Sequence, residues 1–334
     1  MIKVALFGIG RIGRIHANNI TQHTLAQIKY FVDPHSPDIA EFAKSFDATA
    51  ADTDTVLGDP EIQAIVICSS TDTHADLLLR SSQAGKAIFC EKPIDLDIQR
   101  ARRCEQAVRD AGVTCMVGFQ RRFDPTFESL KKRLDAGEIG IPEMLTITSR
   151  DLSPPPLSYV NCSGGIFRDM LIHDFDIFRW IMGAEAETLY ATGSCLIVPE
   201  YQTAGDMDSA VVTIRSQTGI LCQINASRRA EYGYDQRFEV LGSKGMLQAG
   251  NHRPTEVIAA TAQGISTDCT EPFFLERYRI AYTMELKHFF NALTTGAPVR
   301  TTITDAIKAQ ELSEAAVHSW KEGCVVKIKS SSTT

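Results

Sequence analysis

The sequence of 334 residues has no long apolar run and no excess of basic residues. No apolar stretch approaches the roughly 18 residues that a membrane span requires, so none is predicted. Acidic side chains outnumber basic ones and give a formal net charge of −7. Because nucleic acids and anionic membranes bind basic surfaces, this charge excludes both as the main partner.

Paired cysteines are also missing. The nine cysteines are scattered along the chain, and none has the C-x-x-C spacing of zinc or redox sites. Cys68, Cys90 and Cys115 end apolar runs and are predicted to be small core residues. The apolar start, residues 1–7, is too short for a signal peptide. We therefore expect reduced thiols and a cytoplasmic location.

Short apolar strands alternate with helical stretches over the first 120 residues. Such alternation builds a parallel sheet with helices on both faces. The predicted strands are 2–7, 28–32, 64–68, 87–90 and 113–118, and the predicted helices are 12–22, 37–46, 73–84 and 95–110. We expect a doubly wound α/β (Rossmann) domain over residues 1–120.

The pattern changes after residue 120, and we expect a second, α+β domain over residues 121–334. Strands joined by short turns predict an antiparallel or mixed sheet. The predicted strands are 143–150, 188–198, 208–216, 219–227, 236–241 and 246–249, and the predicted helices are 125–136, 169–182, 277–294 and 303–320. The helix 303–320 is expected to pack back on the first domain, and the tail 330–334 to be disordered.

A glycine motif, Gly8-Ile9-Gly10-Arg11-Ile12-Gly13, follows the first strand and opens a helix. Asp33 stands 20 residues further on, at the end of the second strand. This is the context of a dinucleotide fingerprint, in which glycines allow close backbone approach and the acid binds a ribose. The alternative is a glycine turn without a ligand. Because Asp33 repels a 2′-phosphate and no arginine follows it, the expected cofactor is NAD.

Glu91-Lys92-Pro93 follows the fourth predicted strand, at the sheet edge where such folds bind ligands. A lysine there can keep a neighbouring histidine neutral, so that the histidine acts as a base. Taken alone, a Lys-Pro pair is most often only a turn, and its peptide bond can be cis. His74 begins a predicted helix, where capping or packing is as good an explanation as ligand binding.

The segment Gly164–Asp176 places Asp169 and His173 four residues apart on a predicted helix. At about 100° per residue Asp169, His173 and Asp176 share one stripe. A carboxylate beside an imidazole makes that histidine a plausible proton acceptor near neutral pH. The alternative is the solvated side of a surface helix. For Asp174 we prefer a purely structural role, either solvation or packing at the helix end.

Together these motifs resemble the Gfo/Idh/MocA oxidoreductases in order and spacing. The resemblance covers roughly residues 1–320. It is carried by the fingerprint with Asp33, by Cys90–Pro93, Gly118–Asp124 and Gly164–Asp174, and also by Ser227–Asp235. Within the family the chain most resembles members that oxidise inositol.

The resemblance implies roles for individual residues. The catalytic set would be Lys92, Asp169 and His173. Arg122, Asp151 and Tyr232 would line the polyol site with them, while Ser69, His74, Glu91 and Gln120 would lie near the cofactor. It also implies a large open sheet in the second domain, which the family uses for homodimer and homotetramer contacts. No metal is expected, because lysine supplies the cation.

The expected reaction is NAD-dependent oxidation of a ring hydroxyl group. The first candidate is the oxidation of myo-inositol to 2-keto-myo-inositol, as in inositol catabolism. His173 would remove the proton, Lys92 would stabilise the oxyanion and Asp169 would orient the ring. Residues 151–156 depart from the asparagine-proline form of some members, so another inositol isomer or a sugar remains an alternative substrate. A different class of function is a non-catalytic NAD-sensing regulator.

Overall fold

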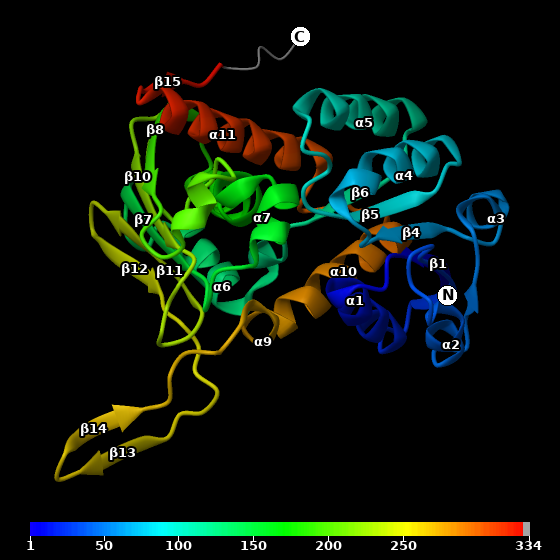
Figure 1. Cartoon of the computed structure of the whole chain (residues 1–334), viewed down its shortest axis with the longest axis horizontal. Helices are drawn as coiled ribbons and strands as arrows, with labels where there is room; N and C mark the ends of the chain where they lie inside the picture. The colour runs from blue at the N-terminus through cyan, green and yellow to red at the C-terminus, as the bar shows by residue number, and fades with distance from the viewer. Residues whose placement is uncertain (330–334) are drawn as a thin grey trace. The chain divides into compact units, whose positions relative to one another are not determined.

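The computed structural model describes residues 1–329, so the predicted tail 330–334 lies outside the described residues. The chain divides into two compact units (Figure 1). Of the described residues, the first unit comprises Met1–Phe123 and Ile280–Lys308, and the second comprises Asp124–Arg279 and residues 309–329. The first boundary follows Phe123 rather than residue 120. Of the predicted helix 303–320 only residues 303–308 belong to the first unit. Nearly all of the preceding helix, Arg279–Thr295, belongs to that unit as well.

A six-stranded parallel sheet forms the centre of the first unit, with the strand order β3-β2-β1-β4-β5-β6. This is the doubly wound order of dinucleotide-binding domains. Its strands are β1 (Ile2–Phe7), β2 (Ala26–Val32), β3 (Thr49–Ala50), β4 (Ala64–Ile67), β5 (Ala87–Glu91) and β6 (Cys115–Gly118). The inner strands β1, β4 and β5 are almost wholly apolar and buried, as strands covered on both faces must be.

Helices cover both faces of this sheet, α4 and α5 side by side on one and α1 on the other (Figure 1). The helices of this unit are α1 (Arg11–Thr21), α2 (Ile39–Lys44), α3 (Thr53–Gly58), α4 (Thr71–Gln83), α5 (Ile98–Ala111), the 3₁₀ turn η1 (Gln120–Phe123) and α10 (Arg279–Thr295). The predicted α/β class is confirmed. The sequence interpretation missed β3 and α3, which are too short to show a period.

The second unit is built on a seven-stranded sheet of order β12-β11-β7-β10-β9-β8-β15. Only β7 and β10 run parallel; the other pairs are antiparallel, which confirms the predicted mixed sheet. Its strands are β7 (Pro142–Arg150), β8 (Ala186–Ser194), β9 (Ser209–Ser216), β10 (Leu221–Ser227), β11 (Asp235–Gly242), β12 (Gly245–Ala249) and β15 (Val326–Lys327). In β9 buried and accessible residues alternate strictly, so one face of the sheet packs on a core and the other is open.

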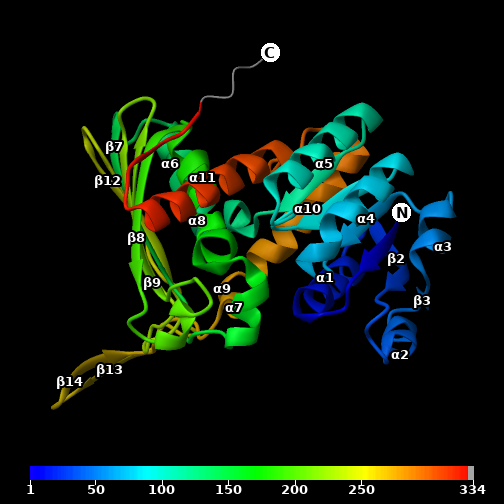
Figure 2. The ribbon, with the colours of Figure 1, turned by 45° about the horizontal axis from the view of Figure 1, so that its top comes forward.

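Helices lie on only one face of this sheet, as its edge-on view shows (Figure 2). They are α6 (Pro125–Asp135), α7 (Leu157–Ser163), the π-helical segment η2 (Ile166–Met170), α8 (Ile172–Met182), the 3₁₀ turn η3 (Pro199–Gln202), α9 (Phe274–Arg277) and the part of α11 (Ile303–Glu322) beyond residue 308. The large open sheet implied by the family resemblance is therefore present.

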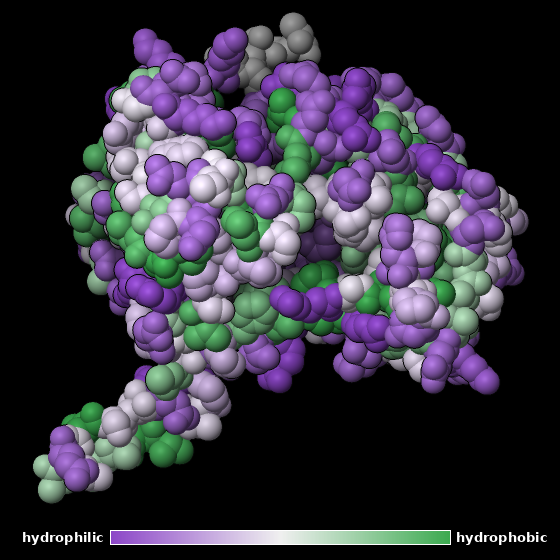
Figure 3. Space-filling view, viewed as in Figure 1, coloured by the Kyte–Doolittle hydropathy of each residue, from purple (hydrophilic) through white to green (hydrophobic). Residues whose placement is uncertain are grey.

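A two-stranded hairpin of β13 (Ile258–Thr261) and β14 (Gly264–Thr267) projects from the second unit, and the sequence interpretation did not foresee it. Every residue of both strands is exposed. Apolar side chains lie along it, seen as green atoms in Figure 3. They include Val257, Ile258 and Ile265, each more than half exposed.

Two predictions concern the missing membrane span and the unpaired cysteines. Within residues 1–329 no helix has both the length and the apolar character to cross a membrane. All nine cysteines are free thiols, and Cys68, Cys90 and Cys115 are buried as predicted.

Candidate active site

The glycine loop of the first unit leaves no room for side chains at two positions. Gly8 has φ +86°, and a Cβ there would stand 2.5 Å from the Ser69 Cα atom. A Cβ on Gly13 would stand 1.9 Å from the Gly8 carbonyl oxygen. The loop therefore requires glycine where the sequence motif has it.

Gly10 differs from these two, because a Cβ there would meet nothing within 4 Å. It is the N-cap residue of α1 and, as a glycine, brings no side chain to cap this helix end. The first turn also carries no acidic residue. A helix N-terminus that has no N-cap side chain and has open space at Gly10 fits a pyrophosphate.

Asp33 lies at the end of β2 and reaches the glycine loop. Its Oδ2 atom accepts a hydrogen bond of 2.9 Å from the Ile9 N–H, and its Oδ1 atom accepts one of 3.1 Å from the His35 N–H. These bonds fix the carboxylate beside the helix N-terminus. The donor set fits NAD, with the glycine loop for the phosphates and Asp33 for a ribose hydroxyl.

Four more residues that were predicted near the cofactor lie at the carboxyl edge of the same sheet or just beyond it. His74 is buried; its Nδ1 atom lies 2.8 Å from the Pro93 carbonyl oxygen and its Nε2 atom 3.0 Å from the Ser69 carbonyl oxygen. Gln120 is buried in η1. The Glu91 side chain turns inward to His16. The fold thus places these residues at the sheet edge where we predicted the cofactor to bind. Their contacts with the cofactor stay a prediction.

Lys92 follows β5 directly, and the Lys92–Pro93 peptide bond is cis. The lysine is half-buried. Both neighbours of the lysine are therefore held in place. Glu91, before it, belongs to β5 and contacts His16, and the carbonyl group of Pro93, after it, contacts His74.

In the second unit the predicted helix 169–182 has a different start. A π-helical segment, η2, precedes α8, and the Leu171 N–H donates to the Ile166 carbonyl oxygen at 2.9 Å. Asp169 belongs to η2 and His173 to α8, so the single regular stripe that we predicted is wrong in its geometry. Both residues remain half-buried. Such π segments occur often at functional sites.

Asp169 has a partner that the sequence interpretation missed. The Tyr159 hydroxyl, from α7, donates a hydrogen bond of 3.0 Å to Asp169 Oδ2. Burial raises the pKa of Tyr159 well above its usual range, and the charge and hydrogen bond of Asp169 add to this effect. The phenol therefore stays protonated as a donor. Nothing in the local sequence after Pro154-Pro155-Pro156 marks this tyrosine.

Asp174 and Asp176 are not solvated. Asp174 is fully buried and its Oδ1 atom accepts a hydrogen bond of 2.9 Å from Gln236 Nε2, while Asp176 is 1% exposed. Of the two structural roles expected for Asp174, solvation is therefore wrong, whereas packing at a helix end agrees with its place in the first turn of α8. The predicted polar stripe does not extend to Asp176, which is buried. The cause is tertiary, because α8 packs beneath β7 and its polar side is covered by the sheet.

The three other predicted substrate residues have these contacts. Arg122 is buried in the first unit, where it donates to the Arg300 carbonyl oxygen at 2.9 Å and to Asp305 Oδ1 at 3.1 Å. The Tyr232 hydroxyl in the second unit donates to Asp235 at 2.6 Å and accepts from Arg150 at 2.7 Å. Asp151 begins the loop after β7, and its N–H donates to the Ser227 carbonyl oxygen at 3.0 Å.

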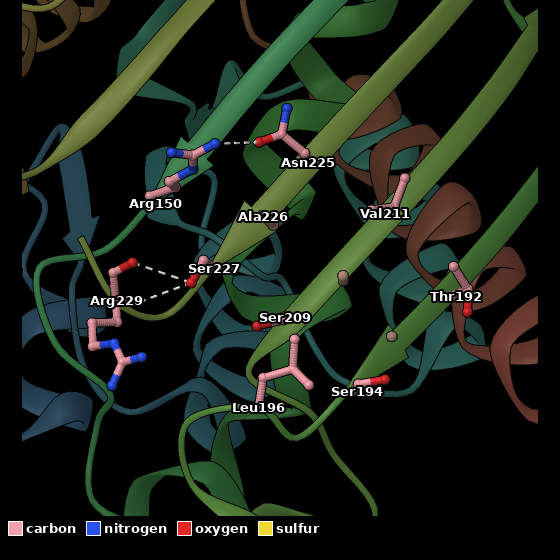
Figure 4. A pocket seen from close by; sticks show the side chains of 12 residues that line it. Arg150, Thr192, Ser194, Leu196, Ser209, Val211, Asn225, Ala226, Ser227 and Arg229 are labelled. Carbon is pink, nitrogen blue, oxygen red and sulfur yellow. Dashed lines mark hydrogen bonds between the residues drawn. The ribbon is translucent and has the colours of Figure 1, made fainter.

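A depression of about 420 Å³ on the open face of the second sheet contains none of the predicted catalytic residues. Side chains of β7 to β10 line it, and on one side of it Arg150 of β7 donates to Asn225 of the adjoining strand β10 at 3.0 Å (Figure 4). Its position on the face without helices separates it from the Asp169–Tyr159 pair in the helical layer.

Comparison with known proteins decides the family. Residues 2–119 match the model of an oxidoreductase family with an NAD-binding Rossmann fold, and residues 127–248 match the GFO/IDH/MocA C-terminal domain. The chain belongs to the Gfo/Idh/MocA oxidoreductase family. Its cofactor is therefore NAD, and it is an oxidoreductase.

Relatives in this family match the whole chain. Inositol 2-dehydrogenase of Rhizobium meliloti (strain 1021) is 44% identical over 96% of this chain and 97% of its own length. The crystal structure of a myo-inositol dehydrogenase from Corynebacterium glutamicum has a TM-score of 0.95 at 40% identity and covers 99% of this chain and 100% of its own. Scyllo-inositol dehydrogenase from Lactobacillus casei, solved with NAD(H) and scyllo-inositol, has a TM-score of 0.92 at 28% identity, with 99% and 100% covered.

Proposed function

We propose that this Gfo/Idh/MocA protein is an NAD-dependent inositol 2-dehydrogenase that converts myo-inositol to 2-keto-myo-inositol. The observation that carries the proposal is similarity over the full length, at 44% identity, to an inositol 2-dehydrogenase. The part of the proposal that concerns NAD rests on the glycine loop, on the helix end at Gly10 and on Asp33. In the oxidative direction the enzyme would open a catabolic sequence.

The proposed catalytic residues are Lys92, Asp169 and His173. His173 accepts the proton of the reacting hydroxyl, which leaves an alkoxide on the ring. The Lys92 ammonium stabilises that negative charge and disfavours the charged form of His173. NAD, when bound, accepts the hydride from the same carbon.

The role of Asp169 is to orient the ring. A carboxylate accepts hydrogen bonds from hydroxyl groups, and one of its oxygens already accepts from Tyr159 at 3.0 Å. The negative charge of this carboxylate suits a neutral polyol better than a phosphorylated or carboxylated ligand, since those would add a like charge. Asp151, Arg122 and Tyr232 stay in the proposed substrate set.

Another substrate in the same reaction class is the first alternative. The similarity to a scyllo-inositol dehydrogenase favours it, as does the departure at residues 151–156. A panel of myo-, scyllo- and chiro-inositol and glucose, followed by NADH absorbance at 340 nm, separates the candidates. The proposal predicts the highest kcat/KM with myo-inositol; a higher value with another member would replace the substrate.

A non-catalytic NAD sensor is the alternative from another class. Retention of Lys92, Asp169 and His173 speaks against it, because a sensor has no use for all three. NAD binding without any NADH formation across the whole panel would favour the sensor.

We also propose that the chain forms a homodimer or homotetramer through the open face of the second sheet. Four large apolar side chains, Leu221, Met144, Leu241 and Met246, are neighbours across β10, β7, β11 and β12. Each is between 41% and 48% exposed. A contiguous apolar row of this kind marks an interface rather than a solvated surface.

The proposed location is the cytoplasm. Nine free thiols fit a reducing compartment, where disulfides do not persist.

A further inference from the structure

A buried polar cluster in the first unit is not explained by NAD or substrate binding. It joins His16 of α1, Glu91 at the end of β5 and Glu285 of α10, and one polar atom from each lies within 4.8 Å of the others. His16 and Glu285 have no exposed surface. Three ionisable side chains in an apolar core are costly, so a specific arrangement must hold them.

Glu91 is fixed from two directions. The His16 Nε2 atom donates to Glu91 Oε1 at 2.8 Å. On another side the carboxyl group packs on the backbone of Gly118, where an added Cβ would stand 2.9 Å from the Glu91 Cδ atom. Glu91 and Gly118 are also partners in the β5–β6 ladder. The side chain therefore anchors the end of β5 in the core.

Glu285 completes the cluster as a neutral acid. Burial raises the pKa of Glu285 well above its usual range, and the charge of Glu91 adds to this shift. Within residues 1–329 neither carboxyl oxygen of Glu285 has a hydrogen-bond partner. Buried polar atoms of this kind are rare, and a protonated carboxyl can donate to a nearby carboxylate. Glu91 is the neighbouring carboxylate in the cluster, with one of its oxygens within 4.8 Å of a Glu285 oxygen.

A bound divalent cation is the competing explanation for such residues. Two ligands of a tetrahedral zinc ion, with bonds of about 2.0 to 2.2 Å, stand about 3.3 Å apart. The His16 and Glu91 atoms are closer, at 2.8 Å, which is a hydrogen-bond distance. The geometry of this pair therefore favours a hydrogen bond over a bridging metal.

We propose that His16 and Glu285 are positioning residues that fix Glu91 and thereby the adjacent Lys92. The lysine lies between two anchored neighbours. Glu91 is held by the buried cluster, and the Pro93 carbonyl oxygen lies 2.8 Å from His74 Nδ1. A change at Glu285 would thus reach Lys92 through one side chain and one peptide unit, although Glu285 touches neither substrate nor cofactor. This role rests on the proposed function of Lys92.

The kinetic test compares Glu285→Leu with Glu285→Gln, which keeps a neutral hydrogen-bonding group of the same shape. We expect Glu285→Leu to lower kcat about tenfold by misplacing the lysine, with the Kd for NAD and the KM unchanged, and Glu285→Gln to stay within about twofold of wild type. In a Lys92→Ala background Glu285→Leu should have no further effect. Additive losses in the double variant, or an equal loss in Glu285→Gln, would overturn the proposal.

Two further arms keep the outcome interpretable. Val56→Ala truncates a fully buried side chain of α3 outside the cluster, so it reports loss of stability in the same unit without a change at Lys92. The acetylation rate of Lys92 by acetic anhydride, measured by mass spectrometry, needs no activity. It should change in Glu285→Leu and His16→Phe but not in Glu285→Gln or Val56→Ala. An unchanged acetylation rate in all four variants refutes the positioning role, even if the protein oxidises no inositol. If the acetylation rates change as expected but no inositol is oxidised, only the proposed function is refuted.

Discussion

The Tyr159 hydroxyl donates a hydrogen bond of 3.0 Å to Asp169 Oδ2, so one oxygen of the proposed orienting carboxylate is already occupied. The two residues come from consecutive helical segments, α7 and η2, on either side of Gly164 and Gly165. Asp169 is thus held by a neighbour that stays protonated.

Removing this donor should weaken substrate binding. In Tyr159→Phe the Asp169 carboxylate loses the hydrogen bond that the phenol donates to it. Such a bond to a charged acceptor is worth about 1.5 kcal/mol, so kcat/KM for inositol should fall about tenfold. Steady-state kinetics measure the change. Tyr30→Phe, at a tyrosine of β2, is the matched control and should keep wild-type values. Equal kcat/KM in wild type and Tyr159→Phe would remove Tyr159 from the site.

Cofactor choice depends on Asp33. Replacing it with Ser removes the charge that repels a 2′-phosphate and also the acceptor for the ribose and for the Ile9 N–H. We expect Asp33→Ser to weaken NAD binding and to raise the NADP-to-NAD preference by at least about tenfold. Titration of both dinucleotides by fluorescence measures this. Asp47→Ser, at an aspartate after α2, is the control, and an unchanged preference in Asp33→Ser would contradict the assignment.

Self-association should depend on the apolar row across β10, β7, β11 and β12. Met144→Lys puts a charge between Leu221 and Leu241, its partners on the two adjoining strands. Burying that charge in an interface is unfavourable, so the molar mass from light scattering after size exclusion should fall. Ile280→Lys, at another exposed apolar residue, should leave the mass unchanged. A wild-type mass in Met144→Lys would place the interface elsewhere.

Asp208 provides a pH-dependent test of the second unit. Its buried carboxylate accepts hydrogen bonds of 2.8 to 2.9 Å from the N–H groups of Leu196, Ile197 and Val198, and one of 2.9 Å from Ser209. Burial alone would raise the pKa of Asp208, but these donors lower it below its usual range. A depressed pKa stabilises the fold above the ordinary carboxyl pKa, and this stabilisation is lost as the pH falls through the folded value.

Asp208→Asn should therefore lower the free energy of unfolding by about 2 kcal/mol near neutral pH. The difference from wild type should begin to shrink below about pH 4, where the Asp208 carboxyl of the unfolded chain takes up a proton, and should vanish below the lower pKa of the folded state. Urea denaturation over a pH series measures both. Asp110→Asn, on the exposed side of α5, should follow wild type at every pH. A pH-independent difference for Asp208→Asn would contradict the electrostatic account.

Local pattern was enough to predict the cofactor half of the molecule. Gly8, Gly13 and Asp33 act within one β-α-β unit, where the tight turn and the strand end follow from short-range sequence. The strands of the second unit could also be predicted from the sequence. Because one face of their sheet is open, buried and accessible residues alternate along them.

Long-range packing explains what the sequence did not predict. The stripe of Asp169, His173 and Asp176 assumed one regular helix, but a π segment intervenes and α8 is covered on its polar side. Glu285 looks like an ordinary charged position of an amphipathic helix until α10 is placed against His16 and Glu91. Tyr159 meets Asp169 only after the chain has turned at Gly164 and Gly165.

The most direct test of the central claim follows the transferred hydrogen. Myo-inositol carrying deuterium at C2 is incubated with NAD and either the wild-type protein or His173→Ala, and the reduced cofactor is analysed by mass spectrometry. His318→Ala, at an exposed histidine, is the control. The account predicts deuterated NADH from wild type and the control, and a rate lower by about 10²- to 10⁴-fold in His173→Ala because the general base is missing. Unlabelled NADH, or a wild-type rate in His173→Ala, would contradict it.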